Sequence, residues 1–100
     1  MSYPLSIITP TGKIFEGDVE HVGVPGVKGS LGILTDHTPM VTALKEGVVS
    51  VRRNSAESFY AIEPGILEVN PDGHVIILCD AATQAQSKEQ AVEHFSAKTA

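Results

Sequence analysis

The sequence predicts a mainly β domain, built as an antiparallel sandwich or barrel and followed by one short C-terminal α-helix. Eight or more short apolar or alternating runs occur with a turn signal every 6 to 12 residues, a spacing typical of such folds. No stretch before residue 84 has a helical period, so a parallel α/β sheet would lack its crossover helices. After Asp80 the composition changes, because residues 81–100 contain no β-branched run and no glycine.

The expected strands are short and separated by glycine, proline and polar residues. Gly17 and Asp18 are expected to separate two strands, and the glycine-rich residues 25–29 to form a loop. A polar hairpin loop is expected at 54–58 and a tight turn at 71–73. The expected strands cover residues 5–8, 14–15, 19–24, 31–34, 40–44, 48–52, 59–62, 66–69 and 74–79.

A single helix is expected at the C-terminal end, where residues 84–100 follow a β-rich domain of residues 1–83. Ser87 and Gln90 have the spacing of a capping box, in which the hydroxyl accepts one backbone N–H and the amide reaches back to another. A helix from Lys88 to the end would be about 20 Å long and marginal alone, so we expect it to dock on the sandwich. The residues expected on one face of this helix are Ala91, Val92 and Phe95.

Composition and charge make several classes of function improbable. The 100 residues make one domain with a net charge of −5 and a pI of about 5.2, and an acidic chain lacks the positive charge that nucleic-acid binding needs. The sequence shows neither the features of a signal or transit peptide nor an apolar run of the roughly 18–20 residues that a membrane span requires. The single cysteine, Cys79, lies in an apolar run and is expected to be a buried hydrophobe in a reducing, cytoplasmic compartment.

The pair Asp36-His37 is the first candidate for chemistry, because an imidazole beside a carboxylate suits acid–base catalysis. Adjacent side chains tend to point apart, however, so a turn in which Asp36 accepts backbone N–H bonds and Pro39 sets the exit is favoured. The histidines are scattered singly, and no nucleophile or phosphate-binding motif is present, so neither a metal nor a cofactor is expected. A small enzyme using Asp36, His37 and Asp80 is kept as an alternative.

Three motifs in sequence order carry a resemblance to a known family. They are T-P-x-G-x-x-F-x-G at 9–17, P-G-x-x-G-x-x-G-I-L-x-x-H-x-P at 25–39, and G-x-L-E-V followed by V-x-I-L within 65–78. Through them, residues 3 to about 82 resemble the epsilon subunit of F-type ATP synthases. The resemblance implies a ten-stranded β-sandwich followed by a helical region.

The resemblance also implies a mechanical function instead of a chemical one. The subunit would lie at the foot of the rotor and clamp the gamma shaft to the ring of c subunits, so that proton transport through the ring drives ATP synthesis. It would not be an enzyme by itself, because the catalytic nucleotide sites of the family lie on other subunits. Its expected place is peripheral, at the cytoplasmic face of a bacterial inner membrane or the equivalent in an organelle. A free-standing β-sandwich adaptor with an unrelated protein partner is kept as a second alternative.

The resemblance assigns two sets of contact residues. In the c-ring-facing loop, many relatives carry acidic residues where this chain has Lys28 and Ser30. The resemblance therefore implies the position of the loop, but not an ion pair between an acidic loop and a basic loop of the ring. The gamma-subunit interface is expected at Thr9, His37, Met40 and Thr42, and the c-ring-facing loop at Val27, Lys28, Gly29 and Ser30.

The C-terminal part departs from relatives that regulate rotation. Those relatives carry two antiparallel helices there, and some bind ATP through an I/L-D-x-x-R-A motif. Residues 81–100 have room for one short helix, and the most similar text, SKEQA, lacks both the Asp and the Arg. We therefore expect neither ATP binding nor inhibition by an extended hairpin.

Overall fold

The computed structural model of the protein describes residues 2–33 and 38–99, with side chains up to residue 93. Ten strands precede one helix within this part of the chain, as the resemblance implies. The elements are β1 (Tyr3–Thr9), β2 (Gly12–Val19), β3 (His21–Gly26), β4 (Gly29–Ile33), β5 (Met40–Leu44), β6 (Gly47–Arg53), β7 (Ala56–Ile62), β8 (Gly65–Val69), β9 (Val75–Cys79), β10 (Ala82–Ala85) and α1 (Lys88–Thr99).

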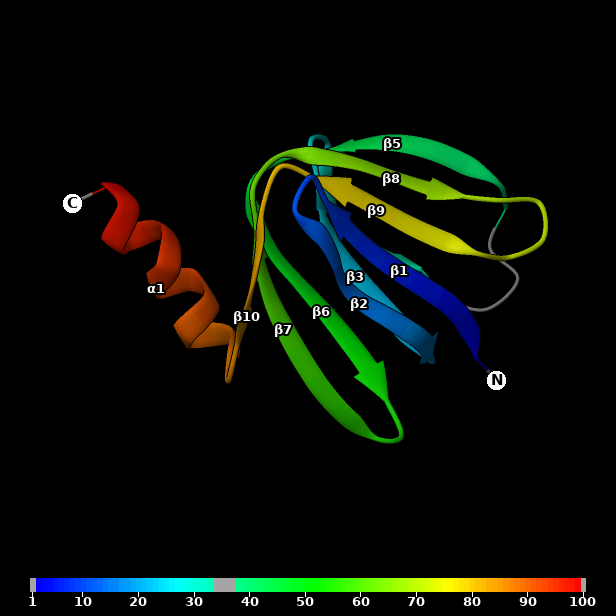
Figure 1. Cartoon of the computed structure of the whole chain (residues 1–100), viewed down its shortest axis with the longest axis horizontal. Coiled ribbons are helices and arrows are strands. Elements are labelled where there is room, and N and C mark those ends of the chain that lie inside the picture. The colour runs from blue at the N-terminus through cyan, green and yellow to red at the C-terminus, as the bar shows by residue number, and fades with distance from the viewer. Residues whose placement is uncertain (1, 34–37, 100) are drawn as a thin grey trace.

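The strands form two layers that meet at β3. One layer has the order β5-β8-β9-β1-β2, and the other contains β4, β3, β6, β7 and β10. The layers join through a single pairing of Gly26 with Leu44. Figure 1 shows β5, β8, β9 and β1 side by side in the first layer, while β6, β7 and β10 lie together in the second.

The expectation of a purely antiparallel sandwich is wrong at one place, because β1 runs parallel to β9. Leu5 lies opposite Val75 and Ile8 opposite Leu78 in this pair. Parallel neighbours need a long connection, and here the strands from β2 to β8 supply it. The first strand is thereby held inside its layer, between β9 and β2.

The core lies between the two layers and consists of alternate residues from their strands. Period-2 alternation places one set of side chains inward and leaves the next set outside. The largest fully buried side chains are Leu5, Ile7, Ile33, Ile62, Leu67, Ile77, Val19, Val22, Val49, Val51 and Val75.

Two expected breaks between strands prove to be strand. Residues 25–29 are not a loop: they belong to a hairpin whose turn is only Val27 and Lys28. A Cβ on Gly26 would lie 2.7 Å from the carbonyl oxygen of Gly29, so glycine here allows close backbone approach. Strand β2 likewise continues through Gly17, where a Cβ would lie 3.1 Å from the Arg53 guanidinium.

Strand β10 was not expected from the sequence, because its four residues lack the β-branched run that marks a strand. It exists because it pairs with β7, with Ala82 opposite Ile62 and Ala85 opposite Phe59. The loop expected at 54–58 is shorter than predicted, because only Asn54 and Ser55 form the turn and β7 begins at Ala56.

Helix α1 begins where the sequence predicts. The Ser87 hydroxyl accepts the backbone N–H of Gln90 at 3.1 Å, whereas the Gln90 side chain accepts the N–H of Gln86, and not that of Ser87, at 2.5 Å. Ala91 is buried against Ala61 and Ala85, so the helix docks on the outer face of the second layer (Figure 1). Val92, which was expected on the same face, is half exposed. The side chain of Phe95 is not among those that the structure describes.

Candidate docking surface

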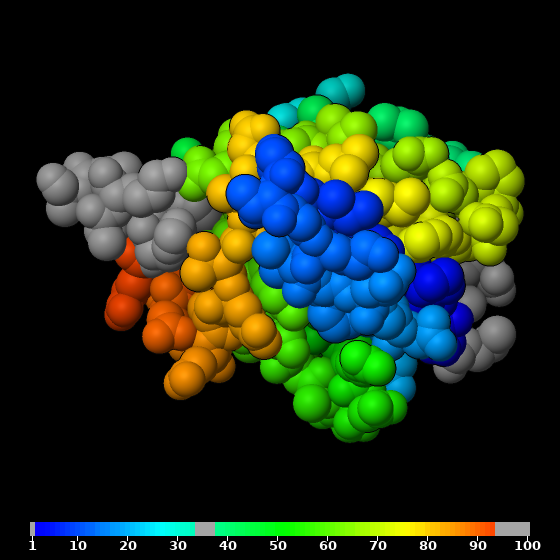
Figure 2. All heavy atoms as spheres, viewed as in Figure 1, coloured from blue at the N-terminus to red at the C-terminus, as the bar shows by residue number. Residues whose placement is uncertain are grey.

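The outside of the first layer carries an apolar surface that we call the outer apolar face. It is made of side chains on β5, β8 and β9 that point away from the core. In register across the strands, Ala43 lies opposite Ile66 and Ile66 opposite Leu78. Figure 2 shows part of this side, with β1 and β2 in blue next to the yellow β9. The residues of the face are Val41, Ala43, Ile66, Glu68, Ile76 and Leu78.

The face exposes more apolar side chain than a solvated sheet would favour. Val41 is 68% exposed, Ile66 40% and Leu78 39%, which is half of the exposed large hydrophobic residues in the described part of the chain. Single exposed hydrophobic residues are ordinary, but a contiguous set on adjacent strands indicates an interaction surface. The first layer is therefore a stronger candidate for a partner contact than the second layer.

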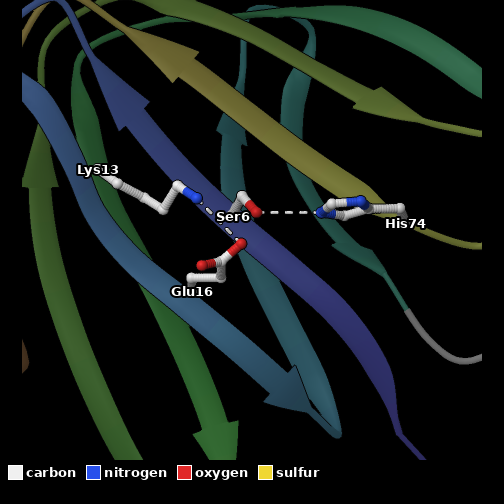
Figure 3. Close-up of polar contacts among 4 residues, drawn as sticks. All are labelled: Ser6, Lys13, Glu16 and His74. Carbon is white, nitrogen blue, oxygen red and sulfur yellow. Dashed lines mark hydrogen bonds and ion pairs between the residues drawn. The ribbon is translucent and has the colours of Figure 1, made fainter.

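Polar side chains border this surface on the β1–β2 side (Figure 3). The Ser6 hydroxyl and the His74 imidazole Nε2 are 3.0 Å apart, and Lys13 Nζ lies 3.0 Å from Glu16 Oε2 in an exposed ion pair. These groups bond to one another, so a partner covering only the apolar part would not disturb them. An apolar centre with a polar rim is the usual anatomy of a protein–protein interface.

The structure places two of the expected gamma contacts on the core side of β5. Along this strand Met40, Thr42 and Leu44 share one side and Val41 and Ala43 the other, and Met40 packs against the core. Alternation permits only one of Met40 and Val41 to face inward, and it is Met40. The sequence did not single out Val41, although the same alternation in MVTAL carried that signal.

The other two expected gamma contacts are Thr9 and His37, and the structure describes only Thr9. Thr9 is only 7% exposed, and its hydroxyl lies 3.1 Å from both the Gly12 carbonyl oxygen and the Thr11 hydroxyl. It therefore shapes the turn between β1 and β2 from inside. His37, together with Asp36, lies outside the described residues.

The expected c-ring loop is the tip of the β3–β4 hairpin. Val27 is 53% exposed and Lys28 follows it, while Gly29 and Ser30 already belong to β4. The Val27 N–H donates to the Ala43 carbonyl at 3.1 Å, so the tip is bonded to β5. A tip held by backbone hydrogen bonds presents its side chains in a defined direction.

Of the three groups in the small-enzyme alternative, only Asp80 lies in the described residues, and Asp36 and His37 lie outside them. Asp80 follows β9, at the end of the layer where Cys79 lies opposite Gly65. Within residues 2–33 and 38–99, no three His, Cys, Asp or Glu side chains cluster as a metal site would require. Cys79 is buried as predicted, and its pKa is raised by burial and, to a smaller extent, by Asp80, which disfavours the reactive thiolate.

Among the described residues, no helix has both the length and the apolar character to cross a bilayer.

Comparison with known proteins agrees with the resemblance in the motifs. The sequence profile of the family described as ATP synthase, Delta/Epsilon chain, beta-sandwich domain matches residues 2–85. The ATP synthase epsilon chain of Halalkalibacterium halodurans is 44% identical over 78 residues, which cover 78% of this chain and 58% of that relative. The ATP synthase epsilon chain of Anoxybacillus flavithermus is 38% identical over 103 residues, covering 94% of this chain and 76% of that relative.

Solved structures show the same fold at low sequence identity. A chain of the Euglena gracilis mitochondrial ATP synthase, in a structure of its OSCP, F1 and c-ring, superposes with a TM-score of 0.80 at 20% identity, covering 98% of this chain and 64% of that one. A chain from the central stalk and c-ring of the Tetrahymena thermophila mitochondrial ATP synthase gives 0.70 at 12% identity, covering 96% and 88%.

The chain spans a little under three fifths of the Halalkalibacterium relative and about three quarters of the Anoxybacillus relative. The profile match extends over the sandwich described above. The chain therefore belongs to the ATP synthase delta/epsilon family, and its residues 2–85 are the β-sandwich domain of an ATP synthase epsilon chain.

Proposed function

We propose that this chain is the non-catalytic epsilon subunit of the rotor of a proton-transporting F-type ATP synthase. It links the gamma shaft to the c-ring and so couples proton transport to ATP synthesis, from a peripheral position at the membrane. The observation that carries the proposal is the outer apolar face, because a rotor coupling needs a large protein contact and no reactive site. Membership in the epsilon-chain family supplies the partners.

The outer apolar face is the surface that binds the gamma subunit in this proposal. Val41, Ile66 and Leu78 lie on three adjacent strands and are all partly exposed. Burying apolar surface contributes about 25 cal/mol per Å², and a standard interface covers about 800 Å² on each partner. Since the face lies on a rigid sheet, a bound shaft can transmit torque through it without bending a loop.

The contacts expected by resemblance border this face. Met40 and Thr42 lie on β5 beside Val41 but on the core side of the strand, and Thr9 holds the β1–β2 turn. In this proposal these three residues support the shape of the surface, and they contribute less to the contact with the shaft. His37 stays a proposed contact on the strength of the motif alone.

The hairpin tip faces the c-ring in this proposal, through Val27, Lys28, Gly29 and Ser30. Two backbone bonds hold the tip: Val27 N–H to the Ala43 carbonyl, and Lys45 N–H to the Pro25 carbonyl at 2.9 Å. The exposed Val27 supplies an apolar contact and Lys28 a positive charge, so the ring loop that it meets does not need to be basic.

Calorimetric titration with the gamma subunit of the same organism tests the gamma contact. Val41→Asp places a charge on the outer apolar face, and we expect it to weaken binding at least about tenfold with little change in unfolding midpoint. Met40→Asp places the charge against the core, and we expect it to lower the free energy of unfolding by about 2 kcal/mol as well.

Val92→Asp is the matched control, because Val92 is 50% exposed on α1, which docks on the other layer. It should bind gamma as the wild type does. Unchanged affinity in Val41→Asp would refute the assignment of the face. No binding by the wild type would refute the rotor function and favour an adaptor with another partner.

We also propose that the chain does not bind ATP. Helix α1 begins with KEQAVE, which lacks the Asp and Arg of the motif in ATP-binding relatives. Titration of ATP into the chain should give no saturable heat, and a saturable signal would refute this part of the proposal.

A further inference from the structure

Glu68 is a carboxylate set inside the outer apolar face. Its cross-strand neighbours are Val41 on β5 and Ile76 on β9, and Ile66 lies two residues away on the same side of β8. The residue is partly buried even in the isolated chain. Apolar side chains therefore border it on three sides.

Within residues 2–33 and 38–99, no hydrogen bond or ion pair joins the Glu68 side chain to another residue. By contrast, Lys13 and Glu16 at the rim of this face form an ion pair, so their charges compensate each other. Glu68 thus brings an uncompensated negative charge to the middle of a surface that is otherwise suited to being covered.

Covering such a carboxylate with apolar atoms is costly, because the ion loses its water and gains nothing in return. A partner that covers this face must therefore supply a cation at this position. Arginine is the better fit, since its planar guanidinium donates two parallel hydrogen bonds to a carboxylate and is easier to desolvate than an ammonium group.

We propose that Glu68 is the specificity-determining residue of the outer apolar face, and that it receives a basic side chain, arginine by preference, from the shaft subunit. The inference rests on the proposed function, and adds the chemistry of the contact to it. A partner with an apolar surface but no cation at this point is rejected, because its binding would bury the charge unpaired. The net charge of −5 also favours approach by a basic surface.

The test is binding of the full chain to the gamma subunit at low and high salt, for the wild type, Glu68→Gln and Glu68→Lys. Glu68→Gln keeps the shape and removes the charge, and we expect binding to weaken about tenfold or more, with a smaller salt dependence than the wild type. Glu68→Lys should abolish measurable binding. Glu57→Gln is the matched control, because Glu57 is exposed on β7 of the other layer.

The outcomes separate this inference from the proposed function. Wild-type binding with unchanged affinity and salt dependence in Glu68→Gln would overturn the role of Glu68 and leave the rotor function standing. Absence of binding by the wild type would overturn both. Equal losses in Glu68→Gln and Glu57→Gln would mean that only long-range charge matters, which also overturns the specific pairing. Unfolding midpoints equal to that of the wild type establish that each variant is folded.

Discussion

The hydroxyl of Tyr3 donates a hydrogen bond to the backbone carbonyl oxygen of Ile33, 2.5 Å away. Tyr3 lies on β1 of the first layer and Ile33 on β4 of the second, so the bond joins the two layers. Both residues are buried, at 5% and 0% exposure. A polar bond in this position fixes how the layers face each other, which apolar packing alone does less specifically.

Tyr3→Phe should destabilise the fold, because it leaves the Ile33 carbonyl without this donor. We expect a loss of about 1–2 kcal/mol in the free energy of unfolding, measured by urea denaturation. Tyr60→Phe is the matched control, since Tyr60 is equally buried but its hydroxyl makes no hydrogen bond to a described residue. Equal losses in the two variants would show that the bond contributes nothing specific.

Stability should fall at alkaline pH through the same residue. Burial raises the pKa of Tyr3 from 10.0 to about 12. The unfolded chain therefore loses this proton at lower pH than the folded one, so the contribution is complete below about pH 10 and is lost as the pH rises to about 12. The stability difference between the wild type and Tyr3→Phe should shrink across this window. A constant difference would contradict the assignment.

Gly65 should not tolerate a side chain, because β8 and β9 approach closely there. A Cβ would lie 2.0 Å from the Leu78 carbonyl oxygen and 2.7 Å from the Cys79 Cα, both backbone atoms. We expect Gly65→Ala to cost about 3 kcal/mol in thermal or urea unfolding. Gly17→Ala serves for comparison, since its Cβ would meet only the flexible end of Arg53 and should cost much less.

Ser55→Gly should stabilise the β6–β7 hairpin. Asn54 and Ser55 both have positive φ, at 54° and 66°, in the two-residue turn between Arg53 and Ala56. This turn favours glycine at its second position, whereas asparagine is tolerated at the first. A gain of about 0.5–1 kcal/mol in unfolding free energy is expected, with Asn54→Gly close to neutral. A loss of stability in Ser55→Gly would show that the hydroxyl has a role not seen in the turn geometry.

Most of the fold could be predicted from local patterns. The alternating runs indicated strands, Ser87 indicated the start of α1, and the motifs identified the family. Strand β10 could not be predicted, since its residues become a strand only by pairing with β7. The residues around Gly26 were mistaken for a loop because glycine marks turns and close backbone contacts alike.

The sequence did not single out the residues of the outer apolar face, and the contacts expected from the resemblance stay predictions. Of the expected contacts, Val27 and Lys28 are exposed at a hairpin tip, whereas Thr9 is buried and Met40 packs inward. Alternation within a strand determines which residues share a side of the sheet, but it does not determine which side a partner covers.

The class of fold, the positions of most strands along the chain, the start of the helix and the family can all be inferred from the sequence, because these follow from neighbours along the chain. Three features depend on the folded structure instead: Val41 faces outward, β1 runs parallel to β9, and Glu68 lies between Val41 and Ile76. The reason is that a surface belongs to several strands at once. Its residues come together through the register of segments far apart in sequence, and that register is set by packing the whole core.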